Sequence, residues 1–305
     1  MDFDYDSLTA LAAVVREGGF EAAANALGVT QSAVSQRIKQ LEERVGTLLV
    51  VRGRPCVPTD TGLQLCRHME QVTLLQHELN GRIRDLLRGP ETHTPTIRIS
   101  VNSDSLATWF PNVLNRATAE LGVLFDVIPD DQEHTEHNLK SGDALAVLTT
   151  IEKPLQGCRR ISLGAMEYMA VASPDFFRQH FDAAPTLAAL ARAPCVSFDR
   201  KDTLPEQWMV LCFGESTRPP SHMIPSNAAY LACCLGGTGW GLMPTETVLP
   251  HVEAGRLVEM VPAKRVQVSL HWQSSTQSSE IMRLLGEIVS DEALNFLKPD
   301  AFRAW

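Results

Sequence analysis

The stretch from Phe20 to Gly46 most constrains how this 305-residue chain folds, because its pattern describes two short helices joined by a tight turn. The first helix has apolar residues at helical spacing and ends at Gly28, which suits a left-handed C-cap. The second helix places its apolar face at Val34, Ile38, Leu41 and Val45. Its other face carries side chains that read base edges and phosphates: Ser32, Ser35, Gln36 and Lys39, with Arg37 beside them. The pattern therefore predicts a helix-turn-helix.

One more helix and a local positive charge belong to the same region. Apolar spacing predicts a helix that begins near Asp6 or Ser7, either of which suits an N-cap, and that ends at Gly18. The whole chain is acidic, with a formal net charge of −9, and this does not by itself argue for nucleic acid. Residues 30–54, however, hold five basic and two acidic side chains, and a local patch is enough for a small DNA-binding module.

A short apolar segment after the second helix predicts a small β-hairpin, or wing. Leu48–Val51 is apolar and partly β-branched, Arg52–Pro55 has the composition of a turn, and Cys56–Pro58 returns. The hairpin would carry Arg52 and Arg54 at its tip. Arginines in a turn are often merely solvated, but beside a helix-turn-helix they favour contact with phosphates or the minor groove.

One long helix is predicted from Thr59 to Arg88. Its N-cap is Thr59, or Thr61 with Gln64 in the capping-box position. Apolar residues alternate by four and three positions as in a coiled coil, with one polar interruption, at Leu65, Met69, Val72, Gln76, Leu79, Ile83 and Leu86. The helix is longer than a small domain needs, so we interpret it as a dimerisation arm. Gly89–Pro95 follows as a polar, proline-bounded hinge.

From Thr96 onward strands and helices alternate, which predicts an α/β region with a ligand crevice at the carboxyl ends of its strands. The length suits two small lobes better than one. Strands are expected at 97–101, 123–128, 144–150, 168–173, 195–198, 241–243 and 266–272. Helices are expected at 106–120, 135–141, 174–180, 186–192, 227–235, 245–254 and 280–297.

Composition narrows the cellular setting. The chain has no apolar run long enough to span a membrane and no secretory signal pattern at its acidic start, so we expect a cytoplasmic protein that does not bind membranes. Seven cysteines occur without a CxxC pair or zinc spacing, which indicates reduced, mostly buried thiols and no metal site. Redox sensing by the vicinal pair Cys233 and Cys234 is the weaker alternative.

The N-terminal motif resembles the LysR-type transcriptional regulators. The resemblance rests on FEAAANALGVTQSAVSQRIKQLEERVGTLLVVR followed by PTDTG, and the long helix and two-lobed region extend it over the whole chain. Within that family the chain looks closest to the lysine- and arginine-sensing ArgP/LysG branch, through SVNSDSLATWFP (100–111), SLGAMEYMAVAS (162–173) and APCVSFDRKD (193–202). One departure is Pro225–Asn227, where the branch suggests Asn-Ser-Ser.

The resemblance implies an α/β fold with an all-α N-terminal part. A winged helix-turn-helix domain would span residues 1–58, a linker helix 59–89, and a periplasmic-binding-protein-like effector domain 90–305. Lobe I would take about 96–162 and 266–305, and lobe II about 163–265. The implied partners are a DNA operator, a small-molecule effector, a second copy of the chain in a homodimer or tetramer, and RNA polymerase, with no cofactor. The DNA-contacting residues carried over are Gln31, Ser32, Ser35, Gln36, Arg37, Lys39, Arg52 and Arg54.

An amino-acid effector needs partners for a carboxylate and for one or two cations. Helix N-termini at Ser103–Ser105, next to Asn102, and at Ser226–Asn227 suit the carboxylate. Carboxylates for the cations fall at predicted strand ends, at Asp104, Asp130, Asp131, Asp199 and Asp202. Asp130, Asp131 and Glu133 could instead form a solvated acidic loop, which is the better interpretation for at least two of them. Asp199, directly after VSF, is the foremost candidate.

Three alternatives compete with a regulator that senses lysine or arginine. A LysR-type regulator with a different effector would keep the same architecture. An enzyme is weakly suggested by the glycine-rich Gly236–Gly241, but this segment follows a helix and lacks the lysine of a phosphate-binding loop. It is better interpreted as a helix C-cap that leads into a strand. A weakly specific chromosome-binding protein would bind operator and random DNA almost equally.

Overall fold

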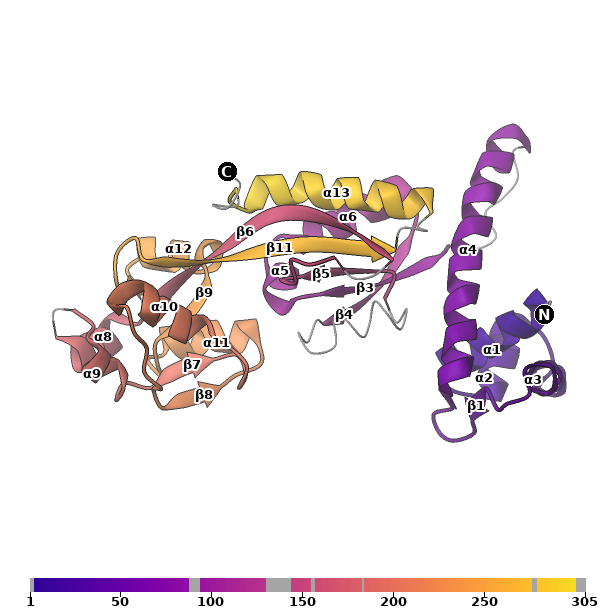
Figure 1. The fold of residues 1–305 in the computed structure, drawn as a ribbon, viewed down its shortest axis with the longest axis horizontal. Coiled ribbons are helices and arrows are strands. Elements are labelled where there is room, and N and C mark those ends of the chain that lie inside the picture. The colour runs from indigo at the N-terminus through magenta and orange to yellow at the C-terminus, as the bar shows by residue number, and fades with distance from the viewer. Residues whose placement is uncertain are drawn as a thin grey trace.

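The computed structural model describes residues 3–87, 94–129, 144–154, 157–182, 184–275 and 279–299. Figure 1 shows an N-terminal helical module at one end, a long helix α4 beside it, and an α/β region that extends away from α4. The predicted fold class is confirmed by this arrangement.

The N-terminal module consists of three helices and a two-stranded wing. Helices α1 (Tyr5–Glu17), α2 (Phe20–Leu27) and α3 (Gln31–Val45) precede strands β1 (Val50–Val51) and β2 (Val57–Pro58). The predicted apolar face of α3 is buried at Val34, Ile38 and Leu41, where it packs against α1 and α2. Gly28 ends α2 in the left-handed conformation, as predicted. The helix-turn-helix and its wing are thus confirmed.

The N-cap predicted for α1 is wrong. The structure uses Asp4, whose carboxylate accepts hydrogen bonds from the backbone N–H groups of Asp6 (3.2 Å) and Ser7 (3.1 Å). The helix begins earlier than its apolar spacing suggests, because Tyr5 and Asp6 already belong to its first turn. The N-cap is the residue that directly precedes the unpaired N–H groups of the first turn. Apolar spacing does not show where that turn begins.

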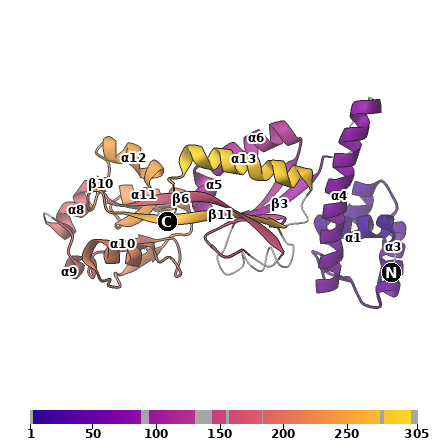
Figure 2. The ribbon, with the colours of Figure 1, turned by 45° about the horizontal axis from the view of Figure 1, so that its top comes forward.

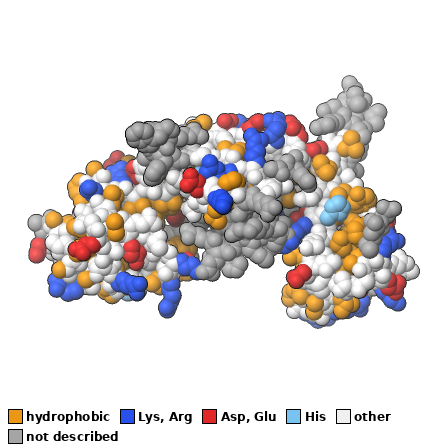
Figure 3. Space-filling model, viewed as in Figure 1, with side chains coloured by type: hydrophobic (Ala, Val, Ile, Leu, Met, Phe, Trp, Pro, Cys, Tyr) orange, Lys and Arg blue, Asp and Glu red, His pale blue; other side chains and the backbone are white. Residues whose placement is uncertain are grey.

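Helix α4 (Asp60–Leu87) carries two different environments along its length. Thr59 caps it by accepting a hydrogen bond from the Gly62 N–H (3.1 Å), so the Thr59 alternative is confirmed. Met69 is buried in the core of the N-terminal module, and Leu74 is buried in the core of the α/β region. Leu79 is 55% exposed. Figure 3 shows apolar side chains over this exposed part of α4.

The predicted coiled-coil stripe of apolar residues on α4 therefore lies in two different environments. Its first half packs within one chain, and Leu79, with its neighbour Leu75, presents an uncovered apolar face. The side chains of Ile83 and Leu86 lie outside the described residues, as does most of the predicted hinge 89–95. A dimerisation role for α4 stays a prediction.

The α/β region is built on one long mixed sheet. Its described strands lie in the order β10-β6-β11-β5-β3-β4, with β9 also paired to β6. We use lobe I for the half that holds β3 (Thr96–Val101), β4 (Leu124–Pro129) and β5 (Ala146–Thr149) with α5 (Ser103–Ala107), α6 (Phe110–Leu121) and α13 (Glu280–Phe296). In lobe I, α6 and α13 pack together over one face of the sheet (Figure 1).

Lobe II holds four short strands and five helices of the described chain. Strands β9 (Gly241–Pro244) and β10 (Val258–Glu259) belong to the long sheet, whereas β7 (Cys195–Ser197) and β8 (Ser221–Met223) pair in a separate parallel sheet. Its helices are α8 (Pro174–Phe181), α9 (Leu187–Leu190), α10 (Leu204–Phe213), α11 (Asn227–Leu235) and α12 (Thr245–Glu253).

Two strands run through both lobes, as both ribbon views show (Figure 1 and Figure 2). Strand β6 (Cys158–Ala172) pairs antiparallel with β11 (Arg265–Ser275) along nearly its whole length. The sequence predicts a strand only from Tyr168, so its first ten residues are missed. A bulge and Gly164, described below, interrupt the alternation there.

Other differences from the predicted elements have local causes. The predicted helix 106–120 is two helices, α5 and α6, because Pro111 has no N–H to donate and fits only the first turn of a new helix. Ser103 and Ser105 thus lie inside α5. Helix α10 is missed because it is apolar on most of its circumference, and β8 and β10 because they are very short. The predicted helix 135–141 lies outside the described residues.

The junction between the wing and α4 leaves no room for a side chain at Gly62. A Cβ atom there would overlap the backbone carbonyl of Leu49, which accepts a hydrogen bond from the Thr59 N–H. We expect Gly62→Ala to destabilise the N-terminal module by about 1–3 kcal/mol, as overpacking typically does. Gly19→Ala is the control, since its Cβ would meet nothing within 4 Å and its backbone is extended. Equal thermal unfolding of the two variants, followed by circular dichroism, would contradict this close packing.

Candidate DNA-binding face and interlobe site

Helix α3 presents a polar face directly opposite its buried one. Ser32, Gln36 and Lys39 are exposed and Ser35 is half-buried, at the three- and four-residue spacing of one helix face. Gln31 is exposed in the first turn. Thr30, not Ser32, is the N-cap, because its Oγ1 accepts the Ala33 N–H (3.2 Å). The Ser32 hydroxyl lies 3.0 Å from this Oγ1. The face as a whole presents hydrogen-bonding side chains of the kind that read a groove.

The basic residues around this face differ in how they are held. Arg37 lies at its flank, where its guanidinium pairs with the Asp6 carboxylate at 3.2 Å. Lys39 is 3.7 Å from Glu43 one turn on, and both side chains are largely exposed. Exposed pairs of this kind contribute little, so a phosphate can compete for either cation.

The wing carries its two arginines at the surface. The turn between β1 and β2 leaves both Arg52 and Arg54 exposed. The Arg52 guanidinium lies over the ring of Phe20, 4.9 Å from its centroid, which ties the wing to the start of α2. Arg54 lies at the hairpin tip.

A second cluster joins the two lobes around Asp104. The Tyr168 hydroxyl of β6 donates to Asp104 Oδ2 (2.7 Å), and the Asn227 amide of α11 donates to Asp104 Oδ1 (2.8 Å). The same amide lies 3.3 Å from the Ser103 carbonyl. Asp104 and Ser103 belong to α5 of lobe I, so this interlobe site is made by three elements from both lobes.

The interlobe site concentrates negative charge out of water. Burial raises the pKa of Asp104, while the hydrogen bonds from Tyr168 and Asn227 act in the opposite direction. Burial likewise raises the pKa of Asp202, and the charge of Asp104 adds to that effect. Burial and then the Asp104 charge raise the pKa of Tyr168, so its hydroxyl remains a donor.

Two further polar atoms at this site are buried. Asn102 Oδ1 and Ser105 Oγ have no hydrogen-bond partner among the described residues. Both flank Asp104 in sequence, on the cap and first turn of α5. Buried polar atoms are nearly always paired in native proteins, so this part of the site is suited to a polar ligand.

The other predicted effector residues have different positions. Asp199, the foremost candidate from sequence, is exposed, and its carboxylate accepts the backbone N–H groups of Lys201 (2.7 Å) and Asp202 (3.0 Å). Asp202 in turn accepts from Phe198 and Leu204, so it shapes the loop while facing the interlobe site. Ser226 is exposed and caps α11. Asp130 and Asp131 lie outside the described residues.

Sequence reasoning did not find Tyr168. It lies in the apolar run MEYMAVA and is almost completely buried, so the pattern around it is that of a core residue. The available signal was its single hydroxyl, which must be paired when buried and thus requires a polar neighbour.

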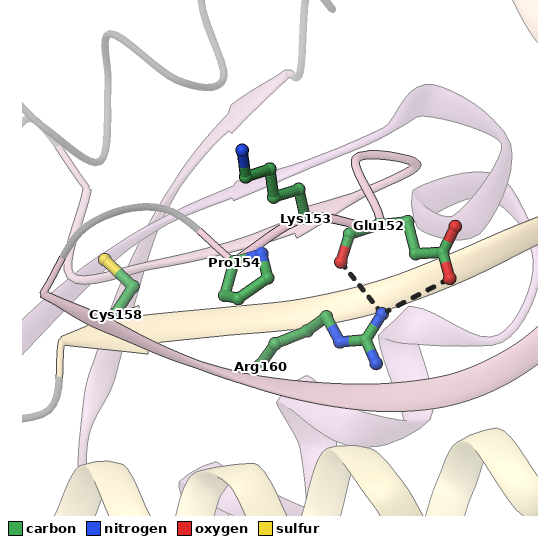
Figure 4. A pocket seen from close by; sticks show the side chains of 5 residues that line it. All are labelled: Glu152, Lys153, Pro154, Cys158 and Arg160. Carbon is green, nitrogen blue, oxygen red and sulfur yellow. Dashed lines mark hydrogen bonds and ion pairs between the residues drawn. The ribbon is translucent and has the colours of Figure 1, made fainter.

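A separate cavity of about 590 Å³ opens at the start of β6. Glu152, Lys153, Pro154, Cys158 and Arg160 line it, and the Arg160 guanidinium donates to the Glu152 carbonyl at 2.8 Å (Figure 4). Tyr168 lies eight residue positions after Arg160 along the extended strand β6, which corresponds to roughly 25 Å. The cavity therefore does not belong to the interlobe site.

Several other sequence features are structural. Gly236 ends α11 and the glycine-rich segment leads into β9, as predicted.

All seven cysteines are free thiols, and burial raises the pKa of Cys66 and Cys234 to about 12, which leaves them unreactive. In the described part of the chain, no helix is long and apolar enough to cross a membrane, and no His, Cys, Asp or Glu cluster could hold a metal.

A winged helix-turn-helix joined to a two-lobed ligand-binding fold defines a ligand-responsive DNA-binding protein. The family described as Bacterial regulatory helix-turn-helix protein, lysR family, matches residues 5–63, and the LysR substrate binding domain matches residues 90–293. The chain therefore belongs to the LysR family and is a DNA-binding transcriptional regulator with an effector-binding domain.

Individual relatives match nearly the whole chain and lie in the ArgP/LysG branch. The HTH-type transcriptional regulator ArgP of Pseudomonas aeruginosa is 40% identical over 287 residues, which cover 93% of this chain and 94% of the relative. The crystal structure of ArgP from Mycobacterium tuberculosis matches with a TM-score of 0.80 at 36% identity, over 98% of this chain and 100% of that one.

A third match carries a ligand. Full-length LysG from Corynebacterium glutamicum with bound effector Arg has a TM-score of 0.69 and 30% identity, over 97% of this chain and 100% of that one. Relatives of this extent are named transcriptional regulators, so the enzyme alternative is set aside.

The raised pKa of Asp104 makes stability depend on pH in a defined direction. Between the ordinary Asp pKa of about 3.9 and the raised folded value, the folded state holds a proton that the unfolded state has released. The stability of the wild type should therefore fall as pH rises through this window. Asp104→Asn removes that contribution, so its urea midpoint should fall less steeply than the wild type's from about pH 4 upward. Parallel midpoint curves would contradict the assignment.

Proposed function

We propose that this regulator senses a basic amino acid, arginine or lysine, at the interlobe site and controls genes of amino-acid transport or metabolism. The observation that carries the proposal is the buried carboxylate of Asp104 in α5, which accepts hydrogen bonds from Tyr168 of β6 and Asn227 of α11 and is subject to the charge of Asp202. Buried carboxylates attract a cation strongly, because water screens them little. The arginine bound as effector to LysG of Corynebacterium glutamicum supports this choice of ligand.

The cationic end of the ligand binds Asp104 in this scheme. Its ammonium or guanidinium takes the place of the Asn227 amide as a donor to Asp104 Oδ1. Asn102 Oδ1 and Ser105 Oγ supply further polar partners on the lobe I side. The ligand carboxylate binds the free backbone N–H groups at the start of α11, next to Ser226.

Binding at the interlobe site is transmitted to the DNA module through α4. Glu78 of α4 accepts a hydrogen bond from the backbone N–H of Ile281 at the start of α13 (2.8 Å), and Leu74 is buried in the core of the α/β region. A change in lobe I therefore reaches α4 directly. An effector alters DNA binding only when it binds two arrangements unequally, and this contact is a place where arrangements differ.

The remaining assignments complete the proposal. The domain bounds 1–58, 59–89 and 90–305, with lobe II at about 163–265, describe the functional units. The chain acts in the cytoplasm, as a homodimer or tetramer on a DNA operator, with RNA polymerase as a further partner. The exposed apolar face of α4 at Leu75 and Leu79 supports pairing through this helix.

Calorimetry with arginine and lysine tests the effector. Asp104→Ala should weaken binding by roughly 10- to 100-fold, the value of one hydrogen bond to a charged group. Asp199→Asn is the control, because it removes an exposed charge nearby while its amide oxygen can still accept the Lys201 and Asp202 N–H groups, and it should bind as the wild type does. Equal losses in the two variants would remove Asp104 from the site. If the wild-type protein bound another metabolite and neither amino acid, the alternative of a LysR-type regulator with a different effector would replace this proposal.

The DNA face is tested by two variants on neighbouring turns of α3. Lys39→Ala should weaken binding to operator and random DNA alike and reduce the salt slope by about one, as loss of a phosphate contact does. Gln36→Ala should instead lower discrimination against random DNA, by about 1–3 kcal/mol. Fluorescence anisotropy on a fragment selected by the wild type, at several salt concentrations, measures both effects. A wild type without operator preference would favour the chromosome-binding alternative.

A further inference from the structure

Strand β6 is irregular at the point where it passes from lobe I to lobe II. Its register with β11 shifts there, because Leu270 pairs with Gly164 whereas His271 pairs with Ser162. Leu163 is thus an extra residue, a β-bulge, and Gly164 has a left-handed φ of +116°. Bulges bend a strand and increase its local twist. Residues 163–164 are therefore where β6 changes direction.

The chain returns to this bend after α13. The Ala165 N–H donates to the Lys298 carbonyl (2.8 Å), and the Lys298 N–H donates to the Ala165 carbonyl (2.9 Å). Leu297 beside it is only 7% exposed. We call Leu297–Lys298 the strap, since it runs antiparallel to β6 and pairs with it at one residue.

Gly164 is the residue that lets the strap lie so close. A Cβ atom at position 164 would be 2.5 Å from the Lys298 carbonyl oxygen and 3.3 Å from Leu297 Cβ. Both the positive φ and this contact require glycine. The bend and the strap are therefore one local structure.

The strap also connects the bend to lobe I. It follows directly on α13, which packs against α6 and against β6. Figure 1 shows this end of α13 above β6, between the two lobes. The strap thus holds a strand leading into lobe II against a helix that belongs to lobe I.

We propose that the strap is a brace that fixes the angle of β6 at Leu163–Gly164 and thereby the separation of the lobes. A change of lobe separation rotates β6 about this bend. The paired Ala165 and Lys298 resist that rotation, because both of their hydrogen bonds must distort. The brace acts whatever ligand the interlobe site takes, so it does not rest on the proposed effector.

Two shortened chains separate the strap from the residues after it. A chain that ends at Leu297 keeps the buried leucine and removes both hydrogen bonds to Ala165, whereas a chain that ends at Pro299 keeps them. Two full-length variants test one of these two hydrogen bonds. Lys298→Pro removes the donor to Ala165, and Lys298→Ala changes only the side chain. Leu297 has φ −82° and ψ 148°, which a following proline accepts.

Hydrogen exchange measured by mass spectrometry reports lobe opening without a ligand. In the chain ending at Leu297 and in Lys298→Pro, segments 102–107 and 226–231, which meet at the interlobe site, should exchange about 10- to 100-fold faster than in the wild type. The chain ending at Pro299 and Lys298→Ala should match the wild type. The proposal would be overturned if both segments exchanged at the wild-type rate in the chain ending at Leu297 and in Lys298→Pro. An equal acceleration of β3 and α6 would also overturn it, because the strap would then be holding lobe I itself together.

Discussion

The antiparallel pairing of β6 with β11 is the connection on which the effector domain depends. These strands are shared by both lobes, so the relative position of the lobes is set by how the pair bends and twists. Tyr168 is carried by β6 and reaches Asp104 of lobe I, while the strap meets the same strand three residues earlier, at Ala165. The interlobe site and the strap thus both contact β6, so a movement of this strand at one of them displaces the other.

The buried carboxylate of Asp104 between the lobes carries a desolvation cost, and this cost bears on the role proposed for it. Asp104 loses hydration, and two neutral donors, a phenol and an amide, only partly replace it. Asp202 adds like charge. In the function proposed above, a cationic ligand would remove both penalties at once, and its binding energy would come partly from relieving the repulsion between the two carboxylates. Because Asp104 and Asn227 belong to different lobes, the same relief changes what holds the lobes together.

How far the sequence predicts this structure depends on how local the determining physics is. The helix-turn-helix and wing are predictable because apolar spacing and three left-handed glycines define them within a few turns. The sequence also names Asp104, as a carboxylate at a strand end, and Asn227, at a helix start, as candidate effector residues, and a role for either stays a prediction. The contact of Tyr168 with Asp104 and the exposed position of Asp199 are not predictable, because burial and loop hydrogen bonds depend on which segments meet across the fold. The strap is likewise not predictable, because Ala165 and Lys298 are distant in sequence and pair through backbone atoms alone.

The contact between α4 and α13 decides what a change in the lobes can do to DNA binding. Helix α4 packs its first half into the core of the DNA module, so that half cannot turn independently of α3. Further along, Leu74 and Glu78 attach it to lobe I, at the N-terminal end of the helix whose other end becomes the strap. A rigid α13 therefore links the bend in β6 to the linker helix. Since α4 also exposes Leu75 and Leu79, a rotation imposed by α13 would reorient the face available to a second copy, and with it the spacing of two DNA modules.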